Sequence, residues 1–171
     1  MKKTVAFSLI LLMLLSLLGC TQQEPQLNNP ISFYYPVVPE YRREDDPVIR
    51  AELHEGNGME TNLLPLLSRY VCGPESPDLV DIFPSDAYPV SIYNHNRAAT
   101  VYMSPGFAKL TGIDLTMACA CLSATLMDIA DLETVNICVK DALLDGNQSI
   151  MMSRDSFTLV DEIYQEPSTN E

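Results

Sequence analysis

The chain has 171 residues, of which 23 are acidic and 10 are lysine or arginine, so its formal net charge is −13 at pH 7. A chain of this length suits a single domain. Such a negative surface repels nucleic acids and anionic lipids, so the composition argues against a nucleic-acid-binding protein and against membrane attachment through a basic surface.

The N-terminus is typical of a secretory signal. Lys2 and Lys3 precede a short apolar stretch that ends in Leu17-Leu18-Gly19-Cys20, and the stretch is too short for a comfortable permanent membrane span. The ending resembles a bacterial lipobox, in which the signal is cut before the cysteine and the thiol is acylated. We therefore predict a signal peptide over residues 1–19 and a lipid anchor on Cys20, on the extracytoplasmic face of the cell membrane. An ordinary cleaved signal with an incidental cysteine is the alternative.

The anchor is expected to lead into one domain through a flexible spacer. Residues 20–30 are polar and have few large apolar side chains, which is typical of a spacer. Residues 31–165 are predicted to form the domain, and residues 166–171 a disordered tail.

The first half of the domain is predicted to contain a strand and a helix. β-branched and aromatic residues favour a strand over Ile31–Val38, and Pro47–Glu55 favours a short strand or a helix. The helix is predicted over Thr61–Cys72, where apolar residues recur every three or four positions, and Gly73-Pro74 ends it. In the polar connection that follows, Ile82 and Phe83 are expected to anchor the chain to the core.

A hairpin and a short helix are predicted next. Pro89–Asn94 and Ala98–Met103 are interpreted as strands, because β-branched and aromatic residues fill them and His95–Arg97 suits a short connection. Residues 104–110 begin with Ser-Pro, which favours the start of a short helix. Gly112 is expected to close that helix.

A long helix over Asp114–Asp131, with Asp114 as its cap, is expected to form the centre of the core. Its polar side is thin, which predicts either burial on more than one side or packing on a sheet together with contact to a partner. The main apolar stripe consists of Leu115, Cys119, Leu122, Leu126 and Ile129.

The C-terminal part is predicted to add strands. Apolar and polar residues alternate over Thr134–Lys140, which indicates a half-buried strand. Asp145–Gln148 is interpreted as a turn, after which Ile150–Met152 returns as a strand. Arg154–Tyr164 is expected to form a last helix or an edge strand.

Four cysteines follow Cys20 and permit two disulfides in three connectivities. They lie within apolar periodic segments rather than loops, so we favour free thiols in the core for Cys72, Cys119, Cys121 and Cys138.

The sequence offers no recognisable catalytic group, cofactor site or metal site. His54 and His95 are interpreted as solvated loop histidines. Cys121 is taken as the most exposed thiol, but no basic neighbour lowers its pKa. The acidic run at residues 44–46 is interpreted as a solvated loop, and the aspartates near residue 145 as part of a hairpin turn, because the spacing of a calcium loop is missing.

Several short motifs, taken in order, resemble the GerMN (sporulation and germination) domain of lipoproteins and exported proteins in spore-forming bacteria. The resemblance covers most of residues 31–157, although Asp145-Gly146 lies further from the preceding strand than expected and Pro39–Glu60 is long and polar. The matching residues are Phe33-Tyr34-Tyr35, Gly73-Pro74, Phe83-Pro84, Ala99–Ser104 with Phe107, the helix Leu115–Ile129 with Thr125-Leu126, the strand Val135–Val139, and Gly146.

The resemblance implies an α+β fold, in which helices pack on one face of a small mixed sheet as in the ring-building modules of envelope secretion machines. It also implies a non-enzymatic role in envelope assembly, sporulation or germination, with an envelope protein as partner, and it carries no catalytic residues. One alternative is a ligand-binding lipoprotein that holds a small molecule or muropeptide in a groove lined by Met117, Cys121 or Tyr102. A thiol-dependent enzyme acting through Cys121 is a further alternative.

Overall fold

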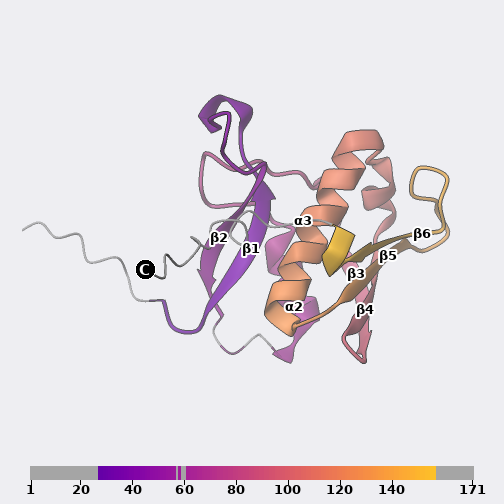
Figure 1. Cartoon of the computed structure of the whole chain (residues 1–171). Coiled ribbons are helices and arrows are strands. Elements are labelled where there is room, and N and C mark those ends of the chain that lie inside the picture. Colours follow the sequence, from indigo (N-terminus) through magenta and orange to yellow (C-terminus); the bar gives the residue numbers. More distant parts are fainter. Residues whose placement is uncertain (1–26, 57, 59–60, 157–171) are drawn as a thin grey trace, which may run out of the picture.

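The structure is a computed structural model that describes residues 27–56, 58 and 61–156. The predicted signal peptide, the lipid anchor at Cys20, most of the spacer and the predicted C-terminal tail lie outside the described residues. The described chain contains a two-stranded sheet, a four-stranded mixed sheet and two α-helices (Figure 1). The predicted α+β class, with helices on one face of a small mixed sheet, is confirmed.

The first sheet pairs β1 (Pro30–Pro36) with β2 (Ile49–Glu55) in antiparallel register, from Pro30 opposite Glu55 to Pro36 opposite Ile49. The predicted first strand is therefore confirmed, and Pro36 ends it because proline cannot donate a ladder hydrogen bond. The segment that the sequence left open between strand and helix is the strand β2.

Hydrogen bonds from two buried tyrosines connect helix α2 (Leu63–Tyr70) to β1. The Tyr35 hydroxyl donates to the carbonyl oxygen of Tyr70 at 2.7 Å, and the Tyr70 hydroxyl donates to the carbonyl oxygen of Tyr34 at 2.7 Å. Each phenol thus satisfies a backbone acceptor in the core, where an unpaired polar group is costly. Gly73, with φ +92°, turns the chain after this helix as predicted.

The second sheet has the strand order β3-β4-β5-β6. β3 (Pro89–His95) and β4 (Ala98–Met103) form the predicted hairpin, whose two turn residues both have positive φ. β5 (Thr134–Val139) lies parallel to β4, and β6 (Ser149–Ser153) lies antiparallel to β5. A parallel neighbour needs a crossover, which the long helix α3 provides.

Helix α3 spans Gly112–Ala130 and follows the 3-10 helix η3 (Pro105–Lys109). Two boundary predictions are wrong. Gly112 begins α3 instead of closing the short helix, because its φ of +55° lets the extended chain turn into the helix. Thr111 therefore occupies the cap position, and Asp114 lies in the first turn, where its charge favours the helix dipole.

Helix α3 lies between the two sheets and contacts β1, β5 and β6 (Figure 1). Leu115, Cys119, Leu122 and Leu126 of the predicted stripe are buried, and burial also reaches polar residues of the helix. Burial on more than one side is therefore confirmed. Among the described helices, α3 is long and apolar enough to cross a membrane, but its packing is that of a core helix.

Candidate functional site

The four-stranded sheet has one side turned away from α3, which we call the outward face. Strand alternation directs Val101 and Ile137 into the core, and the residues before and after each of them to the other side. The register then aligns the outward positions of all four strands. The outward face consists of Val90, Ser91, Tyr93, His95, Ala98, Thr100, Tyr102, Thr134, Asn136, Cys138, Ser149, Met151 and Ser153.

None of these outward residues is an aspartate or a glutamate, although acids outnumber bases 23 to 10 in the chain. The face also exposes large apolar or aromatic side chains: Met151 is 71% exposed, Tyr93 66%, Val90 49% and Tyr102 36%. Protein surfaces normally mix charged residues with single apolar ones, so a sheet face that lacks acids and exposes four large apolar or aromatic side chains is a candidate interaction surface.

A hollow of about 460 Å³ lies on the outward face, lined by Val90, Ser91, Tyr93, Tyr102 and Lys140. The rings of Tyr93 and Tyr102 meet edge to face, with centroids 6.1 Å apart at 85°. Lys140 follows β5 directly, and its ammonium group forms no ion pair with any described residue. The hollow therefore combines two aromatic rings with one unpaired cation.

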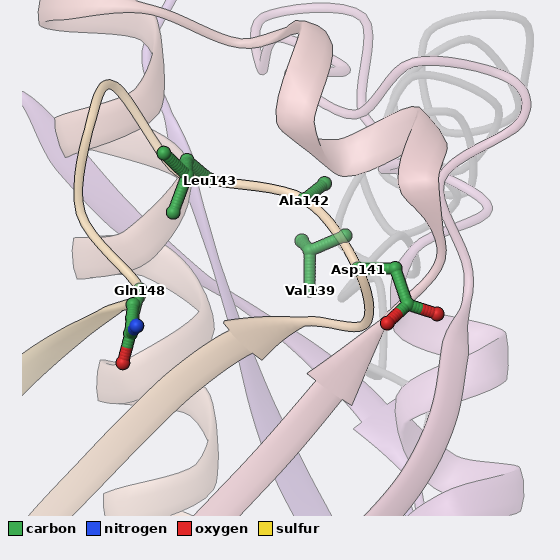
Figure 2. A pocket seen from close by; sticks show the side chains of 5 residues that line it. All are labelled: Val139, Asp141, Ala142, Leu143 and Gln148. Carbon is green, nitrogen blue, oxygen red and sulfur yellow. The ribbon is translucent and has the colours of Figure 1, made fainter.

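A second hollow, of about 340 Å³, lies under the loop between β5 and β6. Figure 2 shows Ala142 and Leu143 on this loop, with Val139 and Asp141 at its start and Gln148 at its end. Two reciprocal backbone hydrogen bonds between Leu144 and Asn147, at 2.7 and 2.9 Å, close the loop. Asp141 and Asp145 have positive φ within turns, which confirms their predicted role.

The structure corrects the interpretation of His54, which is only 6% exposed and lies on β2. Its ring packs on Phe33 with centroids 4.6 Å apart, and its Nε2 lies 2.8 Å from Glu52 Oε2. The other ring nitrogen of His54, Nδ1, lies 3.1 Å from the Nη2 atom of Arg69, a residue of α2. Since arginine can only donate, Nδ1 accepts and Nε2 carries the proton that His54 donates to Glu52. His54 is therefore a core residue that joins β2 to α2.

The thiols are also placed differently from the prediction. Cys121 is fully buried on α3 instead of being the most exposed thiol, because α3 is covered from two sides. Burial raises the pKa values of Cys119 and Cys121 to about 12, which leaves both as protonated core residues. Cys72 is exposed, not in the core, and Cys138 is partly exposed. All four described cysteines are free thiols.

Of the three residues suggested for a ligand groove, Tyr102 lines the hollow on the outward face. Tyr102 belongs to the outward face, whereas Met117 and Cys121 lie on α3 on the other side of the sheet. His95 and the acidic run at 44–46 are exposed, in agreement with solvated positions. Within the described residues, no group of three histidine, cysteine or acidic side chains is placed to hold a metal ion.

A scan of the chain against protein-family models finds no match, and a search of curated proteins finds none either. Among solved structures, the chain is similar to a 2.5 Å crystal structure of a candidate lipoprotein from Clostridium perfringens. The sequence identity is 17% and the TM-score 0.43, over 80% of this chain and 94% of that chain. A likeness at this level carries no argument about function, so the resemblance to the GerMN domain stays a prediction from the residues.

Proposed function

We propose that this protein is a lipid-anchored, extracytoplasmic protein of the cell envelope, which works without catalysis through protein contacts on its outward face. The absence of acids from the outward face, on an otherwise acidic chain, is the observation that carries the proposal. Centres of protein interfaces are depleted in charged residues and enriched in tyrosine and methionine. Tyrosine, serine and asparagine together also make adaptable contacts at low entropic cost.

The anchor is the second part of the proposal. The lipobox-like ending at Cys20 supports acylation, and more than one acyl chain is needed for stable membrane attachment. The acidic domain has little electrostatic attraction to anionic lipids, so the acyl chains supply the attachment. The role that we propose for the anchored domain, from its resemblance to GerMN domains, is in envelope assembly during sporulation or germination, with an envelope protein as partner.

Site-specific photo-cross-linking in native membranes tests whether the outward face is a docking face, that is, a surface that binds the partner protein. A benzoylphenylalanine at Tyr93 reports on the outward face, and one at Tyr41, an equally exposed tyrosine in the 3-10 helix η1 (Pro39–Tyr41), serves as the control. We expect a discrete cross-linked product from position 93 and not from position 41. Introducing Met151→Glu should remove that product, because it buries a charge in the contact. Identical products from both positions, or an unchanged product with Met151→Glu, would contradict the proposal.

A further inference from the structure

The ammonium group of Lys140 differs from most cations of the described chain in having no partner. Arg50, Arg97 and Lys109 each form an ion pair with a carboxylate. Arg154 donates to the carbonyl oxygens of Met127, in the last turn of α3, and Leu132, just after that helix. Lys140, in contrast, forms no ion pair or hydrogen bond with a described residue, in a chain where acids outnumber bases more than twofold. Its neighbour Asp141 lines the other hollow.

The groups around Lys140 favour one kind of ligand. The hydroxyls of Tyr93 and Tyr102 have no hydrogen-bond partner within the described residues, and both line the hollow together with Ser91. A phenol O–H donates well to a carboxylate, and an ammonium group pairs with it at short range. The tyrosine rings and Val90 add apolar surface beside these donors.

The net charge of the chain does not prevent such a contact. At physiological ionic strength the Debye length is ~8 Å, so acids far from the hollow are largely screened. The outward face itself contributes no carboxylate, and Asp141, which follows Lys140 in the chain, lines the other hollow. Charge complementarity at the hollow is therefore local, between Lys140 and a single negative group.

We propose that the hollow takes an aspartate or glutamate side chain that stands next to an apolar residue in a segment of the partner protein. The carboxylate pairs with Lys140 and accepts from a tyrosine hydroxyl, and the neighbouring apolar side chain packs on Tyr93 and Tyr102. The inference rests on the proposed docking face and specifies the chemistry that this face recognises.

The test compares two capped dipeptides, acetyl-Glu-Leu-amide and acetyl-Gln-Leu-amide, in NMR titrations of the full chain. We expect the glutamate peptide to shift the amide signals of Ser91, Tyr93, Tyr102 and Lys140, with at least tenfold weaker binding of the glutamine peptide. Lys140→Met should abolish this preference, and Lys140→Arg should keep it. Lys109→Met is the matched control, because it removes a lysine that is already paired with Asp86.

Equal binding of both peptides, no binding of either, or a preference that survives in Lys140→Met would overturn the inference. The cross-linking experiment separates this failure from that of the proposed function. If the cross-link from position 93 persists while the peptide preference is absent, the docking face stands and the carboxylate chemistry is wrong. If position 93 gives no specific cross-link, the docking face itself is wrong.

Discussion

Glu52 connects β2 to the chain that follows α2. Its carboxylate accepts from the backbone N–H groups of Glu75, at 3.1 Å, and Ser76, at 2.7 Å, and from the ring of His54 at 2.8 Å. The side chain is largely buried, whereas that of Glu75 is 79% exposed. Three donors therefore depend on one acceptor, and a buried donor without a partner is costly.

We expect Glu52→Ala to lower the free energy of unfolding by about 2–3 kcal/mol, because hydrogen bonds to a charged acceptor are among the stronger ones. Glu75→Ala is the matched control and should change it by less than about 0.5 kcal/mol, as is usual for exposed positions. Urea unfolding at neutral pH measures both. Equal effects of the two substitutions would show that the contacts of Glu52 contribute little.

The buried thiols of Cys119 and Cys121 predict a loss of stability at alkaline pH. Burial raises both pKa values from 9.0 to about 12, so the folded chain keeps protons that the unfolded chain releases. The unfolded state then binds fewer protons, and the free energy of unfolding falls as pH rises from about 9 to about 12.

Each thiol should lower the free energy of unfolding by ~1.4 kcal/mol per pH unit above pH 9. Urea unfolding at pH 8, 9 and 10 measures this slope in the wild type and in Cys119→Ala and Cys121→Ala. Each variant is expected to start from a lower stability and to show a smaller slope. A slope that neither Cys119→Ala nor Cys121→Ala reduces would contradict this account.

At the scale of elements, α3 contains one unfavourable residue. Ser123 is fully buried, and its Oγ has no hydrogen-bond partner within the described part of the chain. Ser104, which directly precedes η3, is also buried, but its hydroxyl forms two hydrogen bonds. Its Oγ donates to the carbonyl oxygen of Asp86 at 2.7 Å and accepts from the N–H of Tyr88 at 3.0 Å.

The two serines should therefore respond in opposite directions to alanine. Ser123→Ala is expected to raise the free energy of unfolding by about 1 kcal/mol, since it removes an unsatisfied buried group and improves helix propensity. Ser104→Ala should lower it by about 1–2 kcal/mol, because two backbone groups lose their partner. Thermal and urea unfolding measure the sign of each change in the free energy of unfolding. Destabilisation by Ser123→Ala would indicate that its hydroxyl has a partner in solution.

The sequence predicts best the elements in which apolar residues recur at a regular spacing. β4 and β5 alternate apolar and polar residues because one side of each faces α3, and that pattern is local. The separate sheet of β1 and β2 was not predicted, since β1 is buried at nearly every position and shows no alternation. The start of α3 was missed by two residues because a glycine with positive φ begins it.

The candidate site depends on long-range pairing, which a single sequence does not show. The polar sides of β4 and β5 are visible in the sequence, but only the register places Tyr102 beside Cys138 and Ser91. The burial of His54 likewise depends on Arg69 and on the backbone after α2, which no local pattern brings to it. The residues around Cys121 do not show how deeply its thiol is buried, because β1, which packs on α3, lies far from it in the chain.

At the scale of the whole molecule, the predicted tether enters the structure at one end of β1, whereas the outward face belongs to the other sheet. The buried core cluster of the described residues runs from Ile31 to Leu144. We therefore expect Cys20→Ala to release the protein from membranes into the soluble extracytoplasmic fraction while its melting temperature stays the same. Membrane fractionation and thermal unfolding measure the two properties, and undiminished membrane attachment would contradict a lipid anchor on Cys20.

For a chain exported as we propose, the position of α3 between the two sheets has a consequence. The helix has a mean hydropathy of 1.5 over a window long enough to span a membrane. Its apolar side chains are covered only after β1 and the four-stranded sheet have packed around it. In a chain that is translocated before it folds, this apolar segment is exposed, and a translocation channel can then treat it as a stop-transfer segment. Asp114 and Asp128, near the two ends of the helix, raise the cost of lateral release into lipid. In the export that we propose, these two charges thus favour complete passage of the segment that becomes α3.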